Sequence, residues 1–152
     1  MKKILSLVSL LFIFSCNQGN DSTTLASKNS LQHTEHAADQ ASLTLNDGNK
    51  WKADIITNRN VLELKTLADN FRIKPIRTVQ DYQLVGNDLK AGIDTMINQC
   101  KMKGDDHEAL HHWLEPVLKN VNDLKSLTDT SVGRKLFSSI DDQLDNYKNY
   151  FE

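Results

Sequence analysis

The residues with the clearest capacity for chemistry lie between positions 98 and 113, where the chain reads N-Q-C-K-M-K-G-D-D-H-E-A-L-H-H-W. This stretch brings one cysteine, one methionine and three histidines close together in sequence. Thiolate and thioether sulfur suit soft metal ions, and imidazole suits both copper and zinc. These residue types predict a transition-metal site, provided that the fold brings their side chains together.

The histidines have the spacing of neighbouring turns on one helix. At about 100° per residue, His107 and His111 lie about 40° apart and share a sector with Leu114, so both are expected to face the bundle interior. His112 falls about 100° further round and should face solvent or the rim of the site. A His-x-x-x-His pair is a common way to present two imidazoles to one metal ion. Cys100, at the end of the preceding apolar face, is expected to point inward as well.

Four helices are predicted to position these residues. Apolar side chains recur at three- and four-residue spacing over four segments. The segments are about 54–73, 78–100, 105–127 and 131–150. Four amphipathic segments with short links predict an all-α, up-and-down four-helix bundle. In such a bundle the second helix ends beside the start of the third, so Cys100, His107 and His111 should meet at one end, with Met102 in the loop above.

The predicted core follows from the same spacing. Its members are Val61, Leu64, Ala68, Phe71, Tyr82, Val85, Leu89, Ile93, Met96, Cys100, Leu110, Leu114, Leu118, Val121, Leu136, Ile140, Leu144 and Tyr147.

Outside the helices, residues 43–52 read L-T-L-N-D-G-N-K-W-K, which predicts a short extended arm with an Asp-Gly turn. No matching partner strand follows in the sequence, so no sheet is expected. Asp141, Asp142 and Asp145 are expected on a solvated helix face rather than as a catalytic carboxylate pair. The chain shows no nucleophile–base–orienter arrangement and no Gly-rich phosphate loop. The sequence therefore does not indicate an enzyme.

The N-terminus has the pattern of an export signal. It begins M-K-K, continues without charge from Ile4 to Phe14 and then reads Ser15-Cys16. The apolar run is too short to cross a bilayer, which takes about 20 residues. The stretch I-F-S-C resembles the lipobox of bacterial lipoproteins, in which the cysteine receives the lipid. We expect a signal peptide over 1–15, lipidation at Cys16 and a Gram-negative envelope protein that faces the periplasm, with the choice of membrane left open.

Between the anchor and the bundle, residues 16–41 are mostly Asn, Ser, Thr, Gln and Ala, a composition that predicts a disordered tether. His33 and His36 lie in this tether, either as ordinary solvated residues or as weak auxiliary metal ligands. The helical domain is expected to cover 42–152. With Cys16 lipidated, Cys100 has no partner for a disulfide within the chain.

The charge balance excludes one class of partner. The chain has 18 basic and 20 acidic residues, and loss of Lys2 and Lys3 with the signal leaves 16 basic residues and a net charge of −4. Nucleic-acid binding requires a basic face, so a nucleic-acid partner is not expected.

Two motifs resemble a group of small Bacteroidetes lipoproteins. These are W-K-A-D at 51–54 and C-x-M-x-G-x-x-H-x-x-x-H-x-W over 100–113. Members of the group have a signal, a histidine-bearing linker and a helical C-terminal domain, and no activity is carried over from them. The matched positions in the second motif are Cys100, Met102, His107, His111 and Trp113.

Two functions remain open from the sequence. The first is a membrane-tethered envelope protein that binds copper, or zinc as second choice, through Cys100, Met102, His107 and His111. The second is a non-enzymatic interaction module, in which these side chains only pack and the bundle surface meets an envelope protein. Haem is a third ligand to consider, but the attachment motif C-x-x-C-H is absent from the chain.

Overall fold

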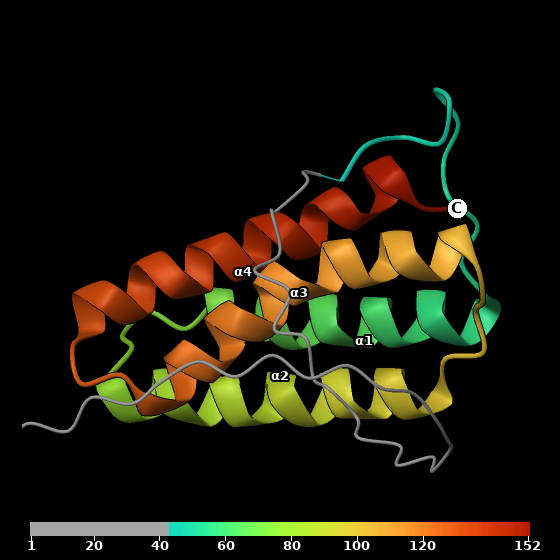
Figure 1. The fold of residues 1–152 in the computed structure, drawn as a ribbon. Coiled ribbons are helices and arrows are strands. Elements are labelled where there is room, and N and C mark those ends of the chain that lie inside the picture. The colour runs from blue at the N-terminus through green and yellow to red at the C-terminus, as the bar shows by residue number, and fades with distance from the viewer. Residues whose placement is uncertain (1–42) are drawn as a thin grey trace, which may run out of the picture. The chain divides into compact units, whose positions relative to one another are not determined.

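The computed structural model describes residues 43–152. Over that range the chain forms four helices and no strand (Figure 1): α1 (Ile55–Arg72), α2 (Val79–Gln99), α3 (Asp105–Ser126) and α4 (Thr130–Tyr150). Each helix packs against the next, and α1 also packs against α4. The predicted all-α, up-and-down four-helix bundle is confirmed.

Three predictions concern residues outside the described range. They are the signal peptide over 1–15, lipidation at Cys16, and the disordered tether over 16–41 with His33 and His36. Among the helices between residues 43 and 152, none is apolar enough over a membrane-spanning length to cross a bilayer.

Capping residues explain where the helices begin. Asp54 accepts a hydrogen bond from the amide of Thr57 at the start of α1, and Asp129 caps α4 in the same way. Thr78 and Asp81 form a reciprocal capping box at the start of α2. Gly104 precedes α3 with a φ of 65°, a left-handed conformation that favours glycine. These local signals place all four helices within a residue or two of their predicted ranges.

The core contains most of the predicted apolar residues and three large aromatic side chains that the spacing argument missed, Trp113, Phe137 and Phe151. Trp113 is 0% exposed and packs edge-on against Tyr147. Its Nε1 donates a hydrogen bond to the backbone oxygen of Gln143 at 3.1 Å, which satisfies the one polar atom of the indole. The buried face of α3 also includes Val117 and Leu124. Three predicted core residues, Cys100, Leu118 and Leu136, are only partly buried.

The arm before α1 finds its partner at the other end of the chain. Asp47 and Gly48 have φ of 50° and 86° and form a tight turn closed by two hydrogen bonds between Asn46 and Asn49. After this turn, Trp51 exchanges backbone hydrogen bonds with residues 150–152 at 2.8 and 3.0 Å. The pairing amounts to one parallel bridge, so no sheet forms. Figure 1 shows that the arm, the C-terminus and the α2–α3 loop share one end of the bundle.

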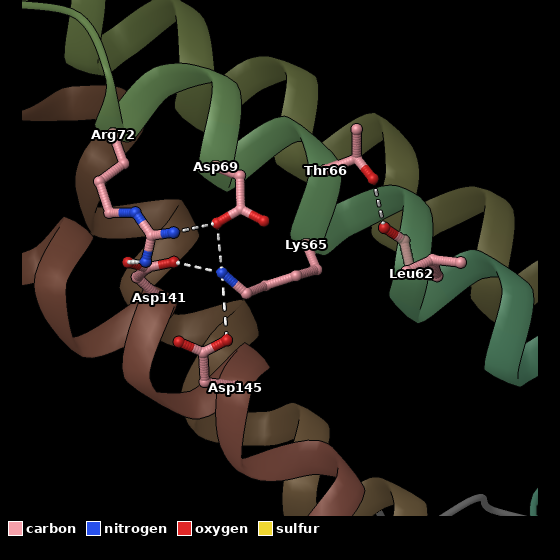
Figure 2. A network of polar contacts seen from close by, with 7 residues as sticks. All are labelled: Leu62, Lys65, Thr66, Asp69, Arg72, Asp141 and Asp145. Atoms are coloured by element: carbon pink, nitrogen blue, oxygen red, sulfur yellow. Dashed lines mark hydrogen bonds and ion pairs between the residues drawn. The ribbon is translucent and has the colours of Figure 1, made fainter.

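The prediction that Asp141 lies on a solvated face was wrong. Asp141 is only 9% exposed and accepts from Lys65 of α1 at 3.3 Å and from Arg72 at 3.2 Å. Figure 2 shows Lys65 between carboxylates of both helices. The Nζ atom of Lys65 lies 3.1 Å from Oδ1 of Asp145. Burial lowers the pKa of Lys65, but its bonds to Asp69, Asp145 and Asp141 outweigh that effect and raise it. These ion pairs join α1 to α4, whereas Asp142 is exposed as predicted.

Candidate metal centre

The candidate site lies where α2 ends and α3 begins. Cys100 is the C-cap of α2, with its amide donating to the oxygen of Met96 at 2.9 Å. After the short loop, the amides of His107 and Glu108 donate to the oxygen of Gly104 at 3.0 and 3.1 Å and start α3. The tight reversal places the Cys100 Sγ atom 3.7 Å from Nδ1 of His107.

His107 also contacts the second histidine of its helix face. The Nε2 atoms of His107 and His111 lie 2.9 Å apart, and the two rings meet edge to face at 87°. One nitrogen must donate the shared proton and the other must accept it. The thiol and the two imidazoles therefore form one continuous chain, and the structure brings together three of the four side chains that the sequence proposed.

These three groups open onto a cavity of about 300 Å³ between α2 and α3. The rest of its lining is apolar and consists of Met96, Ile97, Leu110 and Leu114. An apolar lining lowers the local dielectric constant and so strengthens polar interactions made inside it.

The two histidines are less buried than predicted. Cys100 and His107 are half-buried, whereas His111 is exposed at the rim of the cavity. The prediction placed the apolar face of α3 around Leu114 and omitted Trp113. Once the buried residues of α3 are all included, the centre of that face lies about 85° from His107 and about 125° from His111. Because Ala109, Trp113, Val117 and Leu124 are buried and Leu118 is only partly buried, the apolar face is turned away from both histidines. His111 therefore lies at the surface.

The surroundings of His111 favour its neutral form. Partial burial lowers the pKa of His111 below its ordinary value, and the nearby His107 and His112 lower it further. Glu108 and Glu115 act in the opposite direction without reversing the shift. A neutral imidazole is the form that can coordinate a metal ion.

Met102, the fourth predicted ligand, is not among the residues that line this cavity. Met102 is partly buried and packs against the core from the α2–α3 loop. The thioether among the side chains that line the cavity is Met96, which is only 1% exposed. His112 is exposed as predicted and lines a separate cavity with Trp51 on the other side of α3.

The three polar groups do not yet have the geometry of a bound ion. Between residues 43 and 152, no three His, Cys, Asp or Glu side chains are placed so that they could hold a metal ion. The reason is visible at His107, which presents Nδ1 to Cys100 and Nε2 to His111. Two nitrogens on one tetrahedral ion also lie about 3.3 Å apart, a little further than the histidine pair.

Comparison of the chain with protein-family models, with curated proteins and with solved structures finds no match. The residues of the site and their geometry therefore provide the basis for a functional proposal.

Proposed function

We propose that this protein binds a soft transition-metal ion, with copper favoured and zinc as second choice, through Cys100, His107 and His111. The observation that supports the proposal is the continuous chain from the thiol through both imidazoles, with contacts of 3.7 and 2.9 Å. Sulfur and imidazole together form a donor set that suits copper, and zinc also accepts it.

The step from the observed chain to a bound ion is small. The His107 ring has to rotate so that one of its nitrogens faces the same point as Cys100 and His111. Because His111 is exposed, it can move by the few tenths of an ångström that coordination requires. The ion takes the place of the proton that the two imidazoles share. Met102 lies two residues after Cys100 in the same loop and is the proposed fourth donor.

The cellular setting belongs to the same proposal. A lipid on Cys16 holds the protein to a membrane of the cell envelope, and the bundle faces the periplasm, where copper and zinc ions are handled outside the cytoplasm. The role of the bundle is then binding rather than catalysis.

Metal analysis of the purified chain tests the proposal. The chain from residue 16 onward, carrying Cys16→Ser, has Cys100 as its only thiol. It is exposed in turn to Cu(I), Cu(II) and Zn(II), dialysed and analysed for bound metal and thiol reactivity. We expect one retained equivalent of Cu(I), with Cys100 protected from alkylation only while the metal is bound. A thiol that is protected equally with and without metal, and no retained ion, would favour the interaction module instead.

A further inference from the structure

The W-K-A-D segment, residues 51–54, contacts the polypeptide on both sides of the α2–α3 loop. The amide of Lys52 donates to Oδ1 of Asp106 at 2.9 Å, just after the loop. The amide of Lys101 donates to Oδ2 of Asp54 at 3.0 Å, just before it. Each contact pairs a backbone amide with a carboxylate, which makes both of them strong hydrogen bonds.

The segment is itself held in place, so it can act as a fixed support. Trp51 and Ala53 form backbone hydrogen bonds with residues 150–152. The indole Nε1 of Trp51 donates to the oxygen of Thr44 at 2.7 Å, which ties the tight turn of the arm to the segment. The loop is thereby connected through residues 51–54 to the end of α4.

Asp54 uses its two oxygens for two different purposes. Oδ1 caps α1 by accepting from the amide of Thr57 at 2.6 Å, while Oδ2 accepts from Lys101. Partial burial raises the pKa of Asp54, but the amide hydrogen bonds outweigh it and hold the pKa below the ordinary value. The charged carboxylate therefore joins the start of α1 to the residue that lies between Cys100 and Met102.

We propose that residues 51–54 form a clamp that positions the metal-binding loop, with Asp54 and Asp106 as positioning residues, so that metal binding and docking of the arm strengthen each other. The inference rests on the proposed metal site. Fixing the amide of Lys101 restricts the backbone on both sides of it, and groups that hold ligands in place raise metal affinity. Since coupling is reciprocal, bound metal must hold the arm more firmly by the same factor.

The variants separate the clamp from other roles of the same residues. Asp54→Asn keeps the size of the side chain and a cap oxygen for Thr57, but it places an amide NH₂ opposite the Lys101 amide. Asp106→Ala removes the acceptor for Lys52. Asp105→Ala is the matched control, because Asp105 carries the same charge in the same first turn and makes no side-chain hydrogen bond within residues 43–152.

The first measurement is Cu(I) affinity by competition with a chelator, using the same chain with Cys16→Ser. We expect the Kd to rise about tenfold in Asp54→Asn and in Asp106→Ala and to stay within about twofold in Asp105→Ala. His107→Ala should abolish binding. If His107→Ala abolishes binding while both clamp variants bind as wild type does, the metal site stands and the clamp is rejected. If the wild type binds none of Cu(I), Cu(II) and Zn(II), both proposals fail; if it binds only Zn(II), the same Kd series is measured with Zn(II).

The second measurement is amide hydrogen exchange, which reports on the clamp directly. Bound Cu(I) should slow exchange at the Lys52 and Lys101 amides of the wild type. Asp106→Ala should lose the effect at Lys52, and Asp54→Asn should lose it at Lys101 while Thr57 stays protected. Equal exchange at both amides with and without metal would overturn the coupling, even if the affinities change as expected.

Discussion

The Nε2 atoms of His107 and His111 lie 2.9 Å apart, one turn from each other on α3, while Cys100 contacts the opposite nitrogen of His107. His107 is therefore the central member of the three, since it alone touches both of the others. Any ion that the site binds must replace the contact between the two imidazoles. This relationship gives the metal proposal its sharpest mutational tests.

Removing either member of the histidine pair should abolish metal-dependent stabilisation. At free Cu(I) about 100 times the Kd, binding stabilises the native state by about 2.7 kcal/mol. For a domain of this size, that corresponds to a rise in Tm of about 10 °C. We expect this shift in the wild type and no shift in His107→Ala or His111→Ala. His112→Ala is the matched control on the other side of α3 and should keep the shift; an equal loss there would show that the effect is not specific to the site.

Substitution of the two nearby methionines should identify the thioether donor. Met102→Leu should weaken Cu(I) binding about tenfold and Zn(II) binding less than about twofold, because thioether sulfur prefers soft ions. Met96→Leu serves as the comparison, since Met96 lines the cavity while Met102 packs against the core from the loop. Competition titrations with both ions measure the difference. A Cu(I)-specific loss in Met96→Leu alone would assign the thioether to α2 instead of the loop.

Mild acid should destabilise the metal-free protein through His111. The folded state holds the pKa of His111 below its ordinary value, chiefly by partial burial and then by His107 and His112. As pH falls, the unfolded chain binds a proton at this position first, so the free energy of unfolding declines as pH falls below about 6.5. Asp54 and Asp69 have a lowered pKa, and their contributions are lost only below about pH 4.

Chemical denaturation at pH 7.5 and pH 5.5 separates these two windows. The wild type should lose stability between the two pH values, and His111→Ala should lose less. An identical loss in the variant would assign the pH dependence to other groups.

The ion pairs between α1 and α4 should contribute measurably to stability. Asp141→Ala removes the most buried carboxylate of the cluster and leaves Lys65 and Arg72 without their shared partner on α4. We expect a loss of about 1–3 kcal/mol in the free energy of unfolding. Asp142→Ala, the exposed neighbour, should change it by less than about 0.5 kcal/mol. Urea denaturation of both variants measures the free energy of unfolding. If Asp141→Ala loses no more of it than about 0.5 kcal/mol, as expected for Asp142→Ala, the cluster contributes little.

The anchor proposal has its own test. In cells, Cys16→Ser should yield protein that lacks the lipid and is no longer retained in the membrane fraction. Fractionation and intact-mass measurement of wild type and variant check this expectation. If wild type and variant are retained equally in the membrane fraction and the wild type has the mass of a lipid-free chain, the lipoprotein proposal is rejected. The bundle and its proposed metal site are unaffected by that result.

The sequence by itself determined the elements of the bundle. Apolar residues at three- and four-residue spacing predict all four helices, because only that period places one continuous apolar face on a helix. Local capping signals such as Thr78 with Asp81 then set where the helices begin. The proximity of Cys100 and His107 was also predictable, since a short loop between antiparallel helices leaves few alternatives.

Tertiary structure decided what depends on residues far apart in the chain. The arm pairs with residues 150–152, and Asp141 is buried because Lys65 and Arg72 of α1 meet it there. The side chains of α3 that the other helices bury, among them Trp113 against Tyr147, define a face that leaves His111 at the rim of the cavity. Spacing along one helix cannot reveal these outcomes, because burial and pairing depend on which side chains of other elements fill the same space.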